Sequence, residues 1–525
     1  MPNPSRPSPT DAAPADSDAV PTQTDASPTQ ADGAAADSDA VPTQADGAAA
    51  DSNPAPTRRD TSSTLVDTTA AQAKAAPARA VAAQAGCGAA SGPSGSGPAQ
   101  AGNTPERGRT TPAQAGLTPA QTRLAMQAAV AEGALFAVFS GAIGGNLLTA
   151  FLLDMGATNG QIGLLNALGP LTSLSTLFAA YVLTHLPRRK PFMVGMAFFH
   201  RTLWALAGFI PLLLPSGAQV WAYLAVYFAA NLGISLAGPA WQSIMADTVA
   251  PDLRGRYFGL RNAVVQVATM ATVLWAGRYL DAQPGPSGFR TLYLVALGAG
   301  LLNVGAFLVQ PEPPYIRRDP GNPWRHLALP FRSRPFLAAV LFTSGLSMAG
   351  AMVSPFYTVQ MLRVLHLNYG LVTQLSAVGT ATAIAAHLGL GRLVDRAGEE
   401  TVLGLLPWLS IVPAACWFAV GPDSVLLLYL ISVLQGVIGA LQSLVIFNVN
   451  LGIAPRADRP VYLAAFSAVS GLGGFVAPVL GGAVAGRGGL FPLLWLSIGA
   501  YLLLGLVWQG IVRPRVREAM QAGKA

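Results

Sequence analysis

The sequence predicts an all-α integral membrane protein that places twelve membrane-spanning helices behind a disordered N-terminal tail. Charged residues make up only 11% of the 525 residues and hydrophobic residues 52%, whereas soluble domains carry about 25% charged residues. From Met126 onward, apolar residues gather in runs of about 20, the length that crosses the hydrocarbon layer of a membrane. These runs show no alternation with a period of two, which excludes a membrane β-barrel.

The N-terminal tail, residues 1–125, is dominated by Ala, Pro, Ser, Thr, Asp, Gln and Gly and repeats itself: Ala-Asp-Ser-Asp-Ala-Val-Pro-Thr-Gln occurs at 15–23 and at 36–44. Such a segment cannot bury enough apolar surface to offset its conformational entropy, so we predict disorder. It shows no charged region followed by an apolar run, as a secretory signal would. Two interpretations stay open: a dispensable tail, or a natural start nearer Met126.

The apolar runs predict spans at regular intervals with short connections between them. The expected spans are 126–152, 160–185, 192–213, 218–245, 256–281, 289–309, 334–360, 368–392, 401–420, 424–452, 459–484 and 489–512.

One connection is longer than the others and rich in Pro and Arg, and it separates six spans from six. We therefore divide the chain into a tail (1–125), a first half (126–309), a central loop (310–333), a second half (334–512) and a C-terminal tail (513–525).

The loop charges predict the orientation. If both termini lie in the cytoplasm, most Arg and Lys residues of the loops fall on the cytoplasmic side, and only Arg278, Arg290, Arg363 and Arg487 fall on the other. The positive-inside rule thus predicts a multi-pass protein of the cell inner membrane with both termini cytoplasmic. The net charge of +7 is explained by this topology. No nucleic-acid motif accompanies it, so we expect no nucleic-acid partner.

Several kinds of site are not indicated by the sequence. Cys87 and Cys416 are too far apart in sequence to suggest a metal or disulfide spacing. There is no Gly-x-x-x-x-Gly-Lys-Ser/Thr loop for ATP, and no grouping of Ser, His and Asp that supports catalysis. We therefore expect no enzyme activity, no cofactor and no metal site.

The two halves resemble each other. Gly160 to Gly169 and Gly370 to Gly379 are similar segments that open the second span of each half. Ala250-Pro251 and Ala454-Pro455 both precede a basic residue and a tyrosine between the fourth and fifth spans. Parallel repeats of six spans occur in secondary transporters, among them those of the major facilitator superfamily.

Three stretches carry a resemblance to that family over residues 126–512. Gly391 to Gly398 reads Gly-Arg-Leu-Val-Asp-Arg-Ala-Gly, which is similar to the superfamily's loop signature Gly-x-x-x-Asp-Arg-x-Gly. The equivalent loop of the first half is degenerate, because His185 stands where the acid would align. Trp241 to Arg261 resembles the stretch that many bacterial members carry after the fourth span.

The resemblance implies two six-helix bundles related by pseudo-twofold symmetry, with a central cavity and alternating access. It implies a secondary transporter of a small organic solute, which we expect to be proton-coupled and monomeric in the lipid bilayer. Because charges in the spans are few, export is slightly favoured. An importer of sugars or organic anions stays open, as does a non-transporting sensor or lipid-handling protein on the same fold.

Charged residues inside spans are candidates for function, because burying a charge in the membrane is costly. Glu132 could bind a proton or a cationic substrate, or lie near the headgroups at a helix end. Arg201 could face an anionic substrate, form an ion pair with Glu132, or lie at headgroup level. The other candidates for substrate or proton contact are His200, His387, Asn146, Asn166 and Asn231.

A second group of charges suggests a cytoplasmic gate. By the resemblance, Asp395 would hold the start of the fifth span near Arg254 or Arg256, and Arg188 could meet Asp458. Arg396 and Asp247 lie beside these positions. The alternative is that these residues are solvated charges that only set the topology.

A third group consists of small residues that could allow close helix packing. Gly471 to Gly482 in the eleventh span partly resembles the superfamily's antiporter motif, with Ala477 in place of a Gly, but that motif belongs to the fifth span. We therefore interpret it as helix packing. The residues expected to pack are Gly473, Gly474, Pro478, Gly481 and Gly482.

Overall fold

A computed structural model of the chain describes residues 117–314, 329–455 and 459–516. Within these ranges the regular secondary structure is entirely helical. This agrees with the predicted all-helical membrane fold, since a backbone in hydrocarbon must bond its own polar groups. Most of the predicted tail, part of the central loop and Asp458 lie outside the described residues.

The first half forms nine helical segments, several of them consecutive pieces of one crossing. They are α2 (Pro119–Ile143), α3 (Gly145–Asp154), α4 (Asn159–Ser173), α5 (Ser175–His185), α6 (Lys190–Ala207), α7 (Ile210–Leu213), α8 (Ser216–Thr248), α9 (Arg254–Ala282) and α10 (Pro286–Val309).

The helices of the second half begin at Arg334. Its segments are α12 (Arg334–Ala351), α13 (Ser354–Val359), α14 (Tyr369–Ala397), α15 (Glu399–Cys416), α16 (Val425–Ile453), α17 (Arg459–Gly488) and α18 (Leu490–Val507). Shorter turns adjoin them at η1 (Pro330–Arg332), η2 (Gln360–Val364), η3 (Trp417–Ala419) and η4 (Trp508–Val512).

Helix α2 begins at Pro119, ahead of the expected span at 126. The reason is a capping box. The Thr118 hydroxyl accepts a hydrogen bond from the Gln121 amide (3.3 Å), and the Gln121 side chain accepts one from the Thr118 amide (2.9 Å). With Pro119 at the first helical position, the first turn is stabilised before the apolar run starts.

Nine helical stretches of the described chain are long and apolar enough to cross a membrane. The other three expected spans coincide with α4 and α5, with α6 and α7, and with α9. Helices α4 and α5 are each short because the crossing breaks at Leu174. Helix α6 contains Arg201, and α9 contains several charges along its length. The break and the charges explain why these three spans are not among the nine long apolar stretches.

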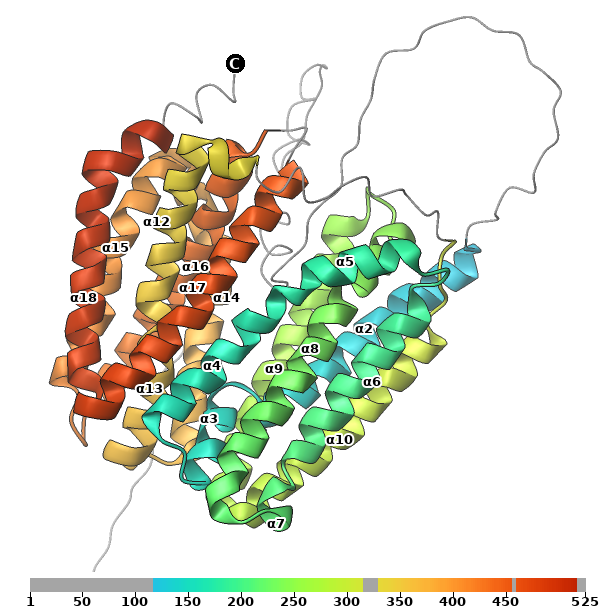
Figure 1. The fold of residues 1–525 in the computed structure, drawn as a ribbon, viewed down its shortest axis with the longest axis horizontal. Coiled ribbons are helices and arrows are strands. Elements are labelled where there is room, and N and C mark those ends of the chain that lie inside the picture. Colours follow the sequence, from blue (N-terminus) through green and yellow to red (C-terminus); the bar gives the residue numbers. More distant parts are fainter. Residues whose placement is uncertain (1–116, 315–328, 456–458, 517–525) are drawn as a thin grey trace, which may run out of the picture. The chain divides into compact units, whose positions relative to one another are not determined.

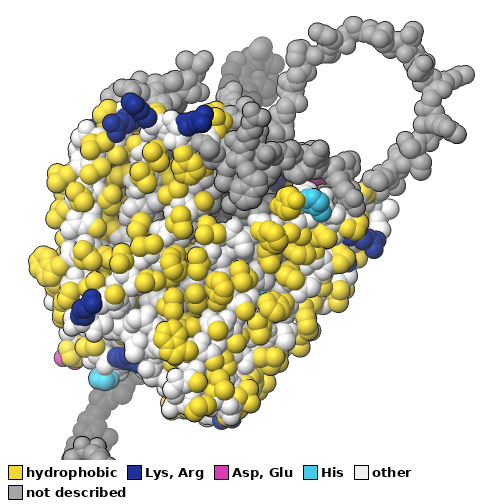
Figure 2. Space-filling model, viewed as in Figure 1, with side chains coloured by type: hydrophobic (Ala, Val, Ile, Leu, Met, Phe, Trp, Pro, Cys, Tyr) yellow, Lys and Arg dark blue, Asp and Glu magenta, His cyan; other side chains and the backbone are white. Residues whose placement is uncertain are grey.

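The helices run back and forth between two ends of the molecule (Figure 1). We call the end where α2 begins and α18 finishes the terminal end, and the opposite end, which includes α3, α7 and α13, the distal end. Hydrophobic side chains cover most of the visible face between the ends, and Lys and Arg gather toward the ends (Figure 2). This distribution is typical of a lipid-facing surface.

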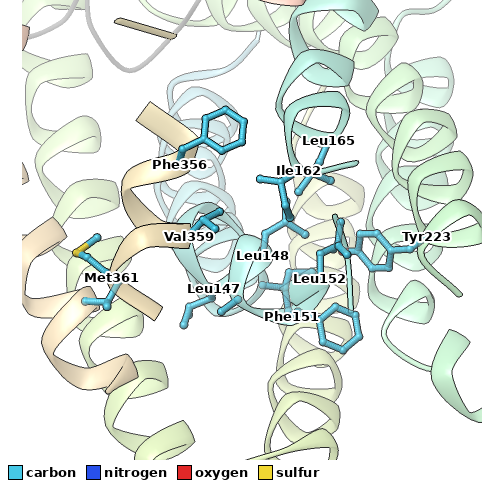
Figure 3. Packing of buried hydrophobic residues seen from close by; sticks show 14 of the residues in the cluster. Leu147, Leu148, Phe151, Leu152, Ile162, Leu165, Tyr223, Phe356, Val359 and Met361 are labelled. Atoms are coloured by element: carbon cyan, nitrogen blue, oxygen red, sulfur yellow. The ribbon is translucent and has the colours of Figure 1, made fainter. Parts of the chain in front are cut away.

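The largest hydrophobic core joins the two halves. It includes Leu148 and Phe151 of α3 and Ile162 of α4 from the first half, with Phe356 and Val359 of α13 from the second (Figure 3). The other cores lie within one half each. The halves are therefore fastened to each other through α3, α4 and α13, toward the distal end.

Helices α4 and α17 cross closely through small residues. A Cβ placed on Gly163 would collide with the Pro478 carbonyl oxygen and lie 2.9 Å from the Gly482 Cα. A Cβ on Gly474 would lie 2.9 Å from the Pro170 ring. A Cβ on Gly473 would similarly meet the Met348 side chain of α12. A Cβ on Gly481 would meet the main chain of Met352, the C-cap residue of α12. Small residues allow the backbones to approach, so van der Waals contact replaces the hydrophobic effect as the source of attraction.

We predict that Gly163→Ala lowers the free energy of unfolding by about 1–3 kcal/mol, because the added methyl group overpacks the α4–α17 crossing. Gly169→Ala in the same helix is the matched control, since nothing lies within 4 Å of its added Cβ. The measurement is unfolding of the detergent-solubilised protein followed by intrinsic fluorescence. Equal stability of the two variants would contradict the close crossing.

Candidate functional site

A cavity of about 510 Å³ lies in the second half, and its wall comes from six crossings. Asn146 of α3 contributes from the first half. Among the described residues, no Asp, Glu, Lys, Arg or His lines it. Its polar lining residues are Asn146, Ser354, Tyr357, Thr358, Ser376, Thr380, Ser410, Trp417, Ser432, Gln435, Gln442, Ser497 and Tyr501. A cavity with apolar walls and a few converging polar groups is the usual form of a small-molecule site.

Two aromatic residues form one wall of this cavity. The rings of Tyr357 and Trp417 stack with centroids 4.6 Å apart and planes 5° from parallel. Trp417 is buried, and its indole Nε1 has no hydrogen-bond partner among the described residues. A buried donor without an acceptor is costly, and such groups call for an explanation in a native structure.

Asn146 connects the halves at the cavity wall. Its Nδ2 donates to the Ser376 hydroxyl of α14 (2.5 Å), and its Oδ1 accepts from the Thr358 hydroxyl of α13 (3.0 Å). The other predicted asparagines bond within their own helices: Asn166 donates to the Ile162 carbonyl and Asn231 to the Tyr227 carbonyl. Of the seven predicted contact residues, Asn146 lines this cavity, and His387 lies half-buried on α14 outside it.

A separate polar network lies inside the first half. Glu132 of α2 forms an ion pair with Arg261 of α9 (2.5 Å), and both side chains are largely buried. Asn303 of α10 donates to the Glu132 carbonyl oxygen (2.6 Å) and accepts from Arg201 Nε of α6 (2.9 Å). Asn303 therefore links Glu132 to Arg201. Glu132 and Arg201 themselves form no direct ion pair in the described chain.

The two arginines of this network also have aromatic partners. The Arg201 guanidinium lies 4.9 Å from the Phe136 ring centroid and 5.8 Å from that of Phe307. The Arg261 guanidinium lies 4.6 Å from the Trp241 ring centroid. Arg201 also adjoins the buried His200 ring, with Nη1 3.4 Å from Nδ1. Cation–π contacts of this kind stabilise a desolvated charge.

Arg261 and Asn303 are the members of this network that were not expected from the sequence. Arg261 lies within the expected span 256–281, close to its start. The rule that a charge inside a span needs a partner applied to it as well as to Glu132. Asn303 carried no distinguishing signal among the many polar residues of the spans.

At the distal end, side chains of one half bind main-chain groups of the other. Asp281 at the end of α9 accepts from the Gly370 amide at the start of α14 (2.9 Å). Arg363 of η2 donates to the Ala157 carbonyl oxygen, just beyond α3 (2.8 Å). Asn159 donates to the Ala485 carbonyl oxygen of α17 (2.9 Å). We call the contacts of Asp281, Arg363 and Asn159 the distal clamps. An acid at a helix N-terminus and a base at a helix C-terminus also suit the helix dipoles.

Comparison with known proteins identifies the family. The model of the Major Facilitator Superfamily matches residues 133–407 and 347–524, which together span most of the chain. The chain belongs to the major facilitator superfamily. Uncharacterized proteins of Mycobacterium tuberculosis and Mycobacterium bovis are 28% identical over 393 residues, covering 70% of this chain and 87% of each relative.

Solved structures share the superfamily fold at low sequence identity. A crystal structure of the nucleoside transporter NupG, in mutant form, has a TM-score of 0.60 at 12% identity and covers 74% of this chain and 99% of that chain. The D-xylose-proton symporter has a TM-score of 0.59 at 14% identity, covering 75% and 98%. A bacterial homologue of the lysosomal transporter Spinster, inward-facing and occupied, has a TM-score of 0.55 at 15% identity, covering 77% and 94%.

Membership confirms the superfamily that the loop signature predicted, and it makes this chain a multi-pass membrane protein and a secondary transporter rather than an enzyme. Proteins of this superfamily bind small-molecule substrates in membranes. Four of the polar residues expected to contact a substrate lie in two separate places: Asn146 in the cavity of the second half, and Glu132, Arg201 and His200 in the charged network of the first. Asn166, Asn231 and His387 belong to neither.

The predicted gate residues that the structure describes lie at the terminal end. Asp247 accepts a hydrogen bond from Arg189 Nη1 within the first half (2.6 Å). The ion-pair partner of Asp247 is therefore Arg189, the residue that follows Arg188. Arg254 donates to the main-chain oxygens of Val249 and Ala246 in the same half. Arg188, Arg256 and Arg396 are exposed. The Asp395 side chain and Asp458 lie outside the described part, so a contact of these acids across the halves stays a prediction.

Glu312 fastens the segment after α10 to the start of α6. Its carboxylate accepts from the Arg189 amide (2.8 Å) and the Lys190 amide (3.1 Å), which are free donors at a helix N-terminus. The Lys190 ammonium donates to the Leu308 and Gln310 carbonyl oxygens. Partial burial lowers the pKa of Lys190, and the charge of Glu312 opposes that shift.

We predict that the Glu132–Arg261 pair is strongly coupled. Glu132→Gln or Arg261→Gln alone should lower the free energy of unfolding by about 3–5 kcal/mol, because each leaves a buried charge without its partner. The double variant should lower the free energy of unfolding by clearly less than the sum of the two single variants. Unfolding of the detergent-solubilised protein measures this cycle. Arg256→Gln, an exposed site on the same helix, is the control and should change stability by about 0.5 kcal/mol or less. Simple additivity would refute the coupling.

We further predict that the distal clamps hold the halves together. Arg363→Gln and Asp281→Asn should each populate longer distances between spin labels on Leu213→Cys and Leu426→Cys, two exposed distal positions in opposite halves. The labels require replacement of Cys87 and Cys416. The control is Arg487→Gln, which removes an exposed distal charge. An unchanged distance distribution in both clamp variants would show that packing alone closes this end.

Proposed function

We propose that this secondary transporter carries a neutral small organic solute, that the solute binds in the cavity of the second half, and that transport is coupled to protons through Glu132. We further propose export by exchange with protons across the inner membrane, with both termini cytoplasmic. The observation that carries the proposal is the absence of any charged side chain from the lining of the cavity within the described chain.

The uncharged lining supports a neutral solute. An ion that entered the cavity would lose hydration without meeting an opposite charge, which costs several kcal/mol. The buried charges of the first half do not supply one, because Glu132, Arg261 and Arg201 already bind one another directly or through Asn303. An organic anion, one of the alternatives from sequence, is therefore disfavoured.

The position of Glu132 supports proton coupling. Among the acidic residues in the described ranges, it alone lies more than two turns from both ends of its helix. Protonation would neutralise the carboxylate that binds Arg261 and so weaken the contact between α2 and α9. A proton can drive a conformational change only if it binds one state more tightly than another, and an ion pair that differs between states provides this difference.

Import is a second candidate. The cavity offers hydroxyl and amide groups as well as apolar surface, which suits a hydrophilic nutrient. The folds of a nucleoside transporter and of a D-xylose-proton symporter are similar to this one. A sensor on the same fold would bind its ligand without moving it.

The test uses everted membrane vesicles with an acidic interior and a pH-sensitive dye. We expect a neutral compound from a panel of neutral, cationic and anionic solutes to release protons from the vesicles. Glu132→Gln should abolish this release. Asp252→Asn, an exposed acid in the turn between α8 and α9, should not. The double variant Glu132→Gln with Arg261→Gln retains balanced charge and should fold yet remain uncoupled.

Each other result has a defined meaning. Undiminished proton release in Glu132→Gln, with equal protein in the membrane, would reject the proton role of Glu132. Accumulation of the solute in right-side-out vesicles, driven by an inward proton gradient, would replace export by import. Binding without flux in either orientation would favour a sensor.

A further inference from the structure

We propose that the cavity of the second half selects a neutral ring compound rich in hydroxyl groups, such as a sugar or glycoside, which packs on Tyr357 and donates its hydroxyl protons to the cavity wall. This inference rests on the proposed function, since that function makes this cavity the solute site. It goes further by naming the chemical class of the solute.

Some hydroxyl groups of the wall act as acceptors. A serine or threonine hydroxyl has one proton. Ser410 donates it to the Leu406 carbonyl oxygen (2.8 Å), and Ser432 to that of Leu428 (2.9 Å). Thr380 donates to the Ser376 carbonyl oxygen (3.0 Å), and Ser497 to that of Ala349 (2.9 Å). None of these four hydroxyls has a proton left for the cavity. Ser432 and Thr380 keep lone pairs that can accept from a ligand, whereas Ser410 and Ser497 also bond the Tyr501 hydroxyl.

The wall also offers donors to the cavity. Gln435 is exposed to the cavity, and no side-chain hydrogen bond engages it within the described residues. The Ser354 and Tyr357 hydroxyl groups also line the cavity, and each has a proton that it can donate. The Trp417 indole nitrogen is fully buried and does not reach the cavity. The wall thus offers its ligand both acceptors and donors. Hydroxyl groups meet both needs, because each can donate and accept.

The aromatic pair supplies an apolar surface for a ring. Tyr357 is half-buried and is supported on one face by Trp417, which holds its ring in place. The C–H face of a sugar ring is apolar, whereas its hydroxyl groups project from the edge. A ring on Tyr357 would therefore direct its edge toward the hydroxyl oxygens of the wall. Aromatic side chains with an apolar body and a polar tip suit such amphipathic ligands.

An ammonium compound is the main competitor. It would also bring donors, and its charge would be attracted to the faces of aromatic rings. The cavity supplies no carboxylate to balance it, however, so a desolvated cation would have only partial compensation. The uncharged donor-rich class is therefore favoured over the charged one.

The test is ligand binding to the purified full-length protein in lipid nanodiscs without any gradient. Thermal stabilisation is measured with D-xylose, methyl glucoside, sucrose and uridine as neutral probes, with choline as the cation and with benzoate as the anion. We expect stabilisation by one or more sugars or the glucoside, and none by choline or benzoate.

Matched variants tie binding to the cavity. Ser432→Ala should weaken binding about fivefold, the loss of one hydrogen bond. Tyr357→Ala should weaken it about tenfold or more, whereas Tyr357→Phe retains the ring and should bind within about twofold. Ser467→Ala is the control, because Ser467 also donates to its own helix but does not line the cavity. The unfolding midpoint without ligand shows whether each variant is folded.

Two outcomes would overturn the inference. Stabilisation by choline or benzoate that responds to these variants would assign a charged substrate and leave the carrier function standing. No stabilisation by any sugar or glucoside would reject the class. Sugar binding that depends on Tyr357 and Ser432, together with no flux in vesicles, would instead support this inference and reject the proposed transport.

Discussion

The structure depends on one constraint: inside the membrane, polar groups must find their partners within the protein. The requirement explains why Glu132 brings α2, α9 and α10 together through Arg261 and Asn303. It also explains why the cavity hydroxyls bond the carbonyl oxygens of helices. Once these internal bonds are made, few polar groups remain available, and the groups that do remain determine what a solute can bind.

The two halves divide the chemistry between them. The first half holds the buried charges, and the second half holds the uncharged cavity. Asn146 belongs to the first half but lines the cavity of the second, so any relative movement of the halves alters its bonds to Ser376 and Thr358. This residue offers a direct physical connection between movement of the halves and the shape of the cavity.

Much of the fold could be predicted from sequence, because the length and apolar content of a run determine whether it can cross the membrane. The break at Leu174 could not, since the nearest proline, Pro170, lies a full turn before it and no charge marks the position. The site was harder to predict, because which residues face one another depends on the rotation of each helix. Glu132 was found by its charge, whereas Tyr357 and Trp417 resemble ordinary core residues until the cavity beside them is seen.

The distal clamps have a consequence for how the sequence can change. Asp281, Arg363 and Asn159 each bind a main-chain amide or carbonyl group rather than a partner side chain. Every amino acid supplies that carbonyl, and all but proline supply the amide. Substitutions at Ala157 or Ala485 can therefore accumulate without removing the atom that is bound. Each clamp can thus be inherited as a single residue, with no need for a matching change across the interface.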